Sequence, residues 1–130
     1  MNNILHVVVG VIINKDDQVL IAKRASHQHQ GDKWEFPGGK VEKAETPQQA
    51  LKRELKEELS IEIQQTKPLI EIKHQYSDKA VLLDVYVVRD WKGEAQGCEG
   101  QPLRWVERSD LKHYDFPAAN AEILSTLDAL

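Results

Sequence analysis

The segment from 38 to 61 constrains this chain of 130 residues more than any other, because it predicts both a helix and the chemistry on its surface. It opens with two glycines and leads into a helix whose start is marked three times. Thr46 is a favourable N-cap, Pro47 suits the first helical position, and Gln49 completes a capping-box pattern. We therefore expect a glycine loop followed by a helix that ends near Leu59.

One face of this predicted helix carries three carboxylates. At about 100° per residue, Glu54, Glu57 and Glu58 fall within an arc of roughly 100°, beside an apolar stripe of leucines. Glu54 and Glu58 have like charge at i,i+4 spacing, which costs an isolated helix about 0.2 to 0.5 kcal/mol. Because Mg²⁺ binds carboxylate oxygens together with water and substrate phosphates, we interpret this arrangement as a metal site rather than a solvated acidic face.

The residues that precede the helix fit the same hypothesis. Gly38 and Gly39 permit close approach of the backbone, so that a carbonyl group can face a metal or a ligand. Trp34 and Phe36 are core residues by default, but an aromatic ring here can also flank a base, a contact that contributes on the order of 1 kcal/mol. Arg24 offers several guanidinium donors to a phosphate or to a base edge.

His27 and His29 form the one pair of residues that could indicate zinc. A His-x-His pair without further cysteine or histidine nearby is a poor match to zinc-site spacing. We therefore expect no zinc site at this pair.

Apolar and β-branched segments predict a sheet. The segments 5–13 and 19–22 flank a polar turn and predict a β-hairpin, and the segments 69–74 and 80–88 predict a second one. The remaining expected elements are a short strand at 61–63, a strand at 103–106, a helical turn at 109–111, and a last helix that packs on the sheet through Ile123, Leu124, Leu127 and Leu130.

The length of 130 residues predicts a single domain over 1–130, and the composition, with 41% hydrophobic and 29% charged residues, is ordinary. A net charge of −4 argues against general affinity for a nucleic-acid backbone. Cys98 is the only cysteine, so no intrachain disulfide forms, and no apolar run approaches the length of a membrane span. No basic region precedes an apolar signal core. We expect a cytoplasmic monomer with no membrane partner and no nucleic-acid polymer as partner.

The spacing of the charged residues over 39–61 resembles the Nudix box: Gly39, five residues, Glu45, seven residues, Arg53-Glu54-Leu55, one residue, Glu57-Glu58 and a closing Ile61. The resemblance implies the Nudix fold, an α/β/α sandwich with a central mixed β-sheet, and cleavage of a nucleoside diphosphate linked to another moiety. Ser60 departs from the pattern, since the family has glycine there. We expect a strained helix end, because the left-handed conformation costs a residue with a Cβ about 1 to 2 kcal/mol.

Three further runs, at 34–40, 99–102 and 116–120, resemble the branch of this family that hydrolyses 8-oxo-dGTP. This resemblance implies Mg²⁺, with Mn²⁺ as a substitute, and the following metal ligands: the Gly39 carbonyl, Glu54, Glu57, Glu58 and Glu99. It also implies Glu54 or Glu99 as general base, with Arg53 orienting the helix carboxylates.

For the nucleoside triphosphate, the same resemblance implies contacts with Arg24, Phe36, Gly38, Lys79 and Asn120. Asn120 is the residue associated most closely with the purine, and a role as N-cap of the last helix is compatible with it. Lys79 departs from the branch, which carries arginine there, so a point charge replaces a planar fork of donors.

The implied reaction is attack of water on the β-phosphorus of 8-oxo-dGTP, which yields 8-oxo-dGMP and pyrophosphate. One alternative is a Nudix pyrophosphatase for CTP or another modified nucleotide. A second is a catalytically silent domain that senses nucleotides, against which the intact Glu54, Glu57 and Glu58 argue. RNA 5′-end processing is a third alternative, disfavoured by the acidic balance and the short chain.

Overall fold

A four-stranded mixed sheet forms the centre of the fold in the computed structural model, which describes residues 4–27 and 31–130. Its strand order is β4 (Gly38–Lys40), β1 (Ile4–Ile12), β6 (Ala80–Lys92) and β5 (Glu62–Gln75). β1 and β6 are parallel, whereas the other neighbours are antiparallel. A second, antiparallel sheet has the order β3 (Trp34–Glu35), β2 (Gln18–Lys23) and β7 (Leu103–Glu107).

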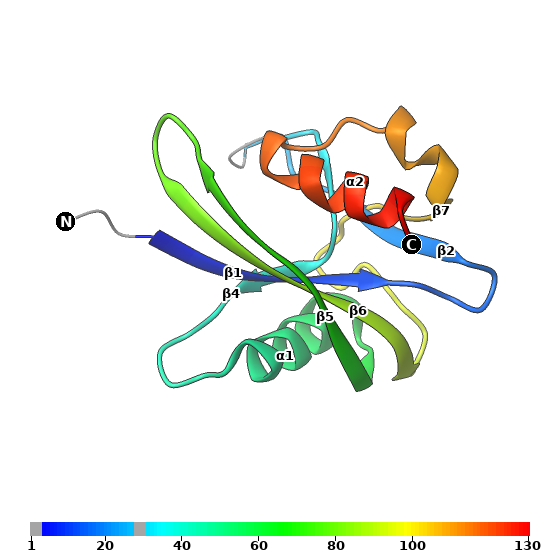
Figure 1. The fold of residues 1–130 in the computed structure, drawn as a ribbon. Helices are drawn as coiled ribbons and strands as arrows, with labels where there is room; N and C mark the ends of the chain where they lie inside the picture. Colours follow the sequence, from blue (N-terminus) through cyan, green and yellow to red (C-terminus); the bar gives the residue numbers. More distant parts are fainter. Residues whose placement is uncertain (1–3, 28–30) are drawn as a thin grey trace.

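Two helices cover opposite faces of the four-stranded sheet, as Figure 1 shows: α1 (Pro47–Leu59) lies below it and α2 (Ala121–Asp128) above it. Two short 3₁₀ turns, η1 (Arg108–His113) and η2 (Ala118–Asn120), lead into α2. This architecture confirms the predicted α/β/α sandwich with a central mixed sheet. In the part of the chain that the structure describes, neither helix is long and apolar enough to span a membrane.

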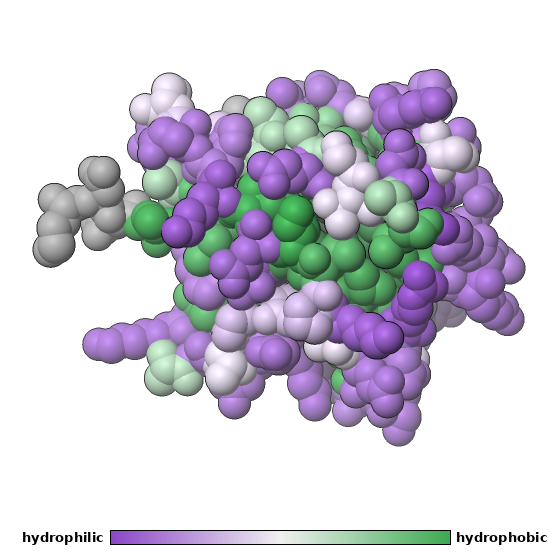
Figure 2. Space-filling view, in the orientation of Figure 1, coloured by the Kyte–Doolittle hydropathy of each residue, from purple (hydrophilic) through white to green (hydrophobic). Residues whose placement is uncertain are grey.

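The strand β1 contributes to two hydrophobic cores because its successive side chains face opposite sides of the sheet. Val8 and Ile12 belong to the core that the leucines of α1 complete, and both are fully buried. Val9 and Val11 belong to the other core, which includes Ile123 of α2. In Figure 2, hydrophobic side chains also gather at the centre of one face, over β5 and β6 and beside α2, with hydrophilic ones around them.

The helix α1 begins and ends as the sequence predicts. Thr46 accepts a hydrogen bond from the Gln49 backbone N–H at 3.1 Å, and the Gln49 side chain accepts one from the Thr46 backbone N–H at 2.9 Å, so the capping box is confirmed. Leu59 is the last helical residue. Ser60 follows with φ 60° and ψ 31°, in the left-handed conformation that we expected to be strained.

The predicted first hairpin is wrong in its pairing. β1 and β2 are strands on either side of a tight turn, but a single bridge between Ile13 and Val19 joins them before they enter different sheets. The second predicted hairpin, β5–β6, is confirmed. The short strand expected at 61–63 is not separate but forms the start of β5. Register shifts around Pro68 let this one long edge strand continue past the proline.

Two smaller expectations are also corrected. The segment Gly38–Lys40 is not a loop but the edge strand β4, paired with β1 through Val7, Val8 and Val9. Leu130 does not pack on the sheet, because α2 ends at Asp128 and leaves the Leu130 side chain 55% exposed.

Candidate active site

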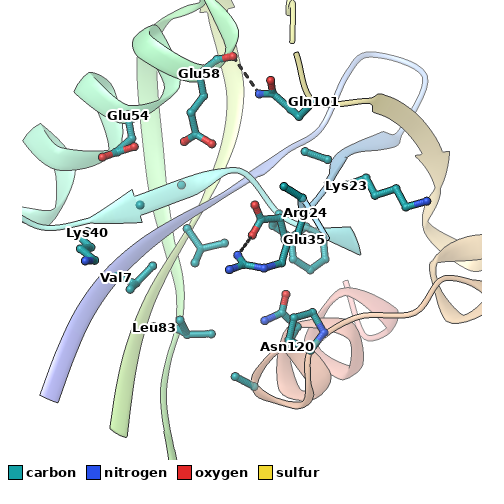
Figure 3. A pocket seen from close by; sticks show the side chains of 18 of the residues that line it. Val7, Lys23, Arg24, Glu35, Lys40, Glu54, Glu58, Leu83, Gln101 and Asn120 are labelled. Carbon is teal, nitrogen blue, oxygen red and sulfur yellow. Dashed lines mark hydrogen bonds and ion pairs between the residues drawn. The ribbon is translucent and has the colours of Figure 1, made fainter. Parts of the chain in front are cut away.

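A cavity of about 800 Å³ opens between α1, the central sheet and the turn η2. Figure 3 shows Glu54 and Glu58 at one end of this cavity and Asn120 at the other, with Arg24 and Glu35 between them. One end of the cavity therefore carries carboxylates, and the far end carries the amide of Asn120.

Arg53 organises the carboxylate-rich end. Its Nε and Nη2 donate to the two carboxylate oxygens of Glu45 at 2.7 and 2.8 Å, a bidentate pair. Its Nη1 donates to Glu54 at 2.8 Å, and Nη2 donates to the Lys40 carbonyl oxygen at 3.1 Å. The same Nη1 lies 3.5 Å from Glu57, at i,i+4 spacing. Hydrogen bonds with Glu45 and Glu54 hold the pKa of Arg53 above its usual range. Arg53 thus links α1 to β4 and fixes the Glu54 carboxylate.

The two glycines of β4 allow close packing against different neighbours, Gly39 against Glu54 of α1 and Gly38 against β1. A Cβ at Gly39 would overlap the carboxylate of Glu54, and a Cβ at Gly38 would overlap the carbonyl oxygen of Val8. Both glycines line the cavity. Gly39 therefore lets Glu54 lie against the backbone of β4, and Gly38 lets β4 lie close to β1.

Glu58 lies deeper in the cavity than Glu54. Burial, together with the neighbouring carboxylates of Glu54, Glu35 and Glu99, raises the pKa of the Glu58 carboxyl to about 9. Its Oε2 atom is buried and has no hydrogen-bond partner in the part of the chain that the structure describes. A buried oxygen without a partner is costly, so Glu58 fits a role in which a cation or a proton binds it.

Glu99 reaches the cavity on a loop that docks on the C-terminal end of α1. The Glu58 carbonyl oxygen accepts hydrogen bonds from the Cys98 backbone N–H at 3.0 Å and from the Gln101 side chain at 3.2 Å. The Gln101 side chain in turn accepts the Glu99 backbone N–H at 2.9 Å. Carbonyl groups that the last helical turn leaves unpaired therefore hold the loop in place.

All five residues expected to contact a nucleotide line the cavity: Arg24, Phe36, Gly38, Lys79 and Asn120. Phe36 lines it but is only 4% exposed and stacks on Phe116 with ring centroids 5.1 Å apart, so it also packs in the core. Lys79 and Asn120 also line the cavity, with Asn120 at the end far from Glu54 (Figure 3). Asn120 occupies the expected N-cap position of α2, but its side chain makes no capping hydrogen bond to the helix.

Of the other residues considered from the sequence, some line the cavity and others do not. Arg24 lines the cavity and forms an ion pair with Glu35. Trp34 is absent from the cavity wall and instead packs edge-on against Tyr114. Of the pair that we considered for zinc, His27 lines the cavity, and His29 lies outside the described residues.

Glu35, Tyr76 and Gln101 are among the cavity residues that were not singled out from the sequence. Glu35 had a detectable signal, because a carboxylate between two aromatic residues is unusual in a strand that leads into the core. Burial raises the pKa of Glu35 against the opposing effect of Arg24. Gln101 and Tyr76 follow no local pattern, since their role depends on contacts with residues about 43 positions away.

The predicted metal ligands do not all converge. The Glu57 side chain is 58% exposed and is absent from the cavity wall, where Gly39, Glu54, Glu58 and Glu99 are found. Within residues 4–27 and 31–130, no three carboxylate, histidine or cysteine side chains are close enough to hold a metal ion by themselves. Mg²⁺ usually takes only one or two carboxylates and completes its shell with water and phosphate oxygens. The unpartnered Glu58 oxygen and the adjacent Glu54 fit such an ion.

Comparison with known proteins assigns the chain and its fold to one family. The model of the Nudix domain matches residues 8–126, and the chain belongs to the Nudix hydrolase family. It is 39% identical to 8-oxo-dGTP diphosphatase of Escherichia coli (strain K12), over 97% of this chain and 98% of that protein. It is 36% identical to CTP pyrophosphohydrolase of the same organism, over 95% and 91%. A solved structure from work on MutT of Aliivibrio salmonicida and Vibrio cholerae superimposes with a TM-score of 0.86 at 36% identity, covering 98% of each chain.

Proposed function

We propose that this protein hydrolyses 8-oxo-dGTP to 8-oxo-dGMP and pyrophosphate, and so removes an oxidised nucleotide from the cytoplasmic pool before it is used in DNA synthesis. The observation that carries the proposal is the division of one cavity into a carboxylate end, with Glu54, Glu58 and Glu99, and a base end with Asn120. The similarity to 8-oxo-dGTP diphosphatase over nearly the full length of both chains supports it.

The carboxylate end is suited to substitution at phosphorus by water. Mg²⁺, when bound, would neutralise charge on the triphosphate oxygens and make a bound water more acidic. Glu54 is the stronger candidate for the general base, because Arg53 and the backbone of β4 fix its carboxylate, whereas Glu99 is exposed on a loop. Arg53 acts by orientation, since its guanidinium group is already shared between Glu45 and Glu54.

The base end is suited to reading a purine. Phe36 and the neighbouring apolar wall provide a surface for the ring, and the Asn120 amide offers one acceptor and two donors. A site that hydrogen-bonds a group found only on the oxidised base can discriminate by 10⁴ or more, because the normal base leaves those partners unpaired.

A nucleotide panel tests the proposal. With Mg²⁺ present, we expect release of pyrophosphate from 8-oxo-dGTP at a kcat/KM at least about 100-fold above that for dGTP or CTP. In H₂¹⁸O, attack at the β-phosphorus places the label in pyrophosphate and not in the monophosphate. Equal rates on 8-oxo-dGTP and dGTP would exclude the sanitising role, and preference for CTP would favour the activity of the second relative.

The catalytic carboxylate is tested separately. Glu54→Gln keeps the size of the side chain and removes its basicity, so we expect kcat to fall by about 10² to 10⁴. Glu99→Gln should have the smaller effect if Glu54 is the base. Glu94→Gln, in the same loop as Glu99 but outside the cavity wall, is the matched control and should retain activity.

A further inference from the structure

Tyr76 connects two walls of the cavity that are far apart in the sequence. It follows β5 at the tip of the β5–β6 hairpin, where its backbone N–H donates to the Lys79 carbonyl oxygen at 2.8 Å. Its phenolic oxygen accepts a hydrogen bond from the Ala119 backbone N–H at 3.1 Å. Tyr76, Lys79, Ala119 and Asn120 all line the cavity. A single side chain thus joins the hairpin that carries Lys79 to the turn that carries Asn120.

The position of η2, the turn that carries Asn120, depends on the Tyr76–Ala119 hydrogen bond because the turn is short. η2 is only three residues long, and its N-cap residue, Pro117, contributes no side-chain hydrogen bond. Ala119 is 4% exposed, so its backbone N–H needs an acceptor within the protein. The Tyr76 hydroxyl group provides that acceptor and therefore holds the backbone directly before Asn120.

Asn120 itself is not fixed by the helix that follows. Its side chain makes no capping hydrogen bond to α2, so this helix does not fix the direction of the Asn120 amide. A displacement of this turn would move the amide relative to the carboxylate end without changing Glu54 or Glu58, which lie at the far end of the cavity (Figure 3).

We propose that Tyr76 is a positioning residue for base recognition. By accepting the Ala119 backbone N–H, its hydroxyl group fixes the position of Asn120 and thereby the preference for the oxidised purine. This inference rests on the proposed function. It predicts an effect on substrate affinity and selectivity, and little effect on the chemical step.

Tyr76→Phe is the decisive variant because it removes one oxygen atom and keeps the ring. We expect KM for 8-oxo-dGTP to rise about 5- to 10-fold, the size expected from one lost hydrogen bond, with kcat within about twofold of the wild type. KM for dGTP should change less, so that selectivity falls. Tyr114→Phe is the matched control: that hydroxyl group contacts Arg104 at 3.3 Å, outside the cavity wall, and its removal should leave both parameters unchanged.

A double-variant cycle separates positioning from general loosening. If Tyr76 acts through Asn120, then Tyr76→Phe should change KM by less than about twofold in an Asn120→Ala background. An equal loss in both backgrounds, or an equal loss on 8-oxo-dGTP and dGTP, would overturn the inference. Thermal unfolding of each variant shows whether the fold is retained.

Hydrogen exchange gives a test that does not depend on turnover. The Ala119 amide should exchange faster in Tyr76→Phe than in the wild type and should be unaffected in Tyr114→Phe. Unchanged Ala119 exchange would overturn the inference even if the enzyme prefers 8-oxo-dGTP. The two failures can be told apart. If the Ala119 amide exchanges faster in Tyr76→Phe but the wild type does not prefer 8-oxo-dGTP, the hydrogen bond is confirmed and the proposed function is wrong.

Discussion

Ser60 shows how one residue departs from the requirement of its backbone position. It ends α1 with φ 60°, a conformation that costs a residue with a Cβ about 1 to 2 kcal/mol. We predict that Ser60→Gly raises the free energy of unfolding by about 1 kcal/mol, measured by urea denaturation. Ser60→Ala keeps a Cβ and should give no such gain. A glycine variant no more stable than the alanine variant would contradict the argument.

Glu45 gives a pH-dependent prediction at the same scale. Hydrogen bonds from the Arg53 side chain and from the Glu42 backbone N–H lower the pKa of Glu45 to about 2, below the ordinary 4.5. A lowered folded-state pKa stabilises the protein above pH 4.5, and this stabilisation is lost as the pH falls toward 2. Glu45→Gln should therefore lower the melting temperature near pH 6. The gap to the wild type should close between pH 4.5 and 2 in thermal scans without metal, and a gap that does not change with pH would contradict the ion pair.

The loop that carries Glu99 makes a prediction at the scale of an element. The Gln101 side chain links the Glu99 N–H to the Glu58 carbonyl oxygen, so it holds two proposed metal ligands relative to each other. We predict that Gln101→Ala raises the Mg²⁺ concentration for half-maximal activity by roughly tenfold. Direct Mn²⁺ binding, followed by electron paramagnetic resonance, should weaken in parallel.

The same loop provides the control for this prediction. Gln96 also contacts the end of α1, but through its backbone N–H, which donates to the Leu59 carbonyl oxygen at 2.9 Å. Gln96→Ala retains that bond and should bind Mn²⁺ as the wild type does. If Gln101→Ala and Gln96→Ala had equal affinity for Mn²⁺, the loop would be held by its backbone alone.

The elements that the sequence predicted best are those specified by neighbouring residues. The start of α1 depends on Thr46 and Gln49, three positions apart, and was read correctly with its capping box. The pairing of β1 could not be predicted in this way, because its partners are β4 and β6, which lie about 30 and 75 residues further along the chain. Apolar periodicity identifies a strand but not its neighbour, so the nearest strand, β2, was chosen wrongly.

The same limit applies to the candidate site. The spacing from Gly39 to Glu58 is local and identified the carboxylate end of the cavity. The contacts of Tyr76 with Ala119 and of Gln101 with Glu58 join residues 43 positions apart and have no sequence pattern of their own. Helical spacing also grouped Glu57 with its neighbours, although its side chain turns outward and pairs with Arg53.

Arg108 makes a prediction at the scale of the whole molecule, because it joins the β1–β2 turn to the end of the chain. Its Nε and Nη2 lie 2.9 and 2.8 Å from Asp17, and its Nη1 donates to the carbonyl oxygens of Leu127 and Leu130, each at 3.2 Å. Through Arg108, these contacts join the last turn of α2 to Asp17, about 110 residues earlier in the chain. We predict that Arg108→Ala lowers the free energy of unfolding by about 1 to 2 kcal/mol, measured by urea denaturation.

Two further variants test whether this effect comes from the guanidinium fork. Arg108→Lys keeps the charge but cannot bind Asp17 and the helix end together, so its stability should fall between those of the wild type and Arg108→Ala. Arg89→Ala removes an exposed arginine that makes no ion pair among the described residues, and it should change stability by less than about 0.5 kcal/mol. Because Arg108 and Asp17 lie outside the cavity wall, kcat/KM should be unchanged in all three variants. A loss of activity in Arg108→Ala at temperatures where it remains folded would show that the position of α2 is coupled to the base end of the cavity.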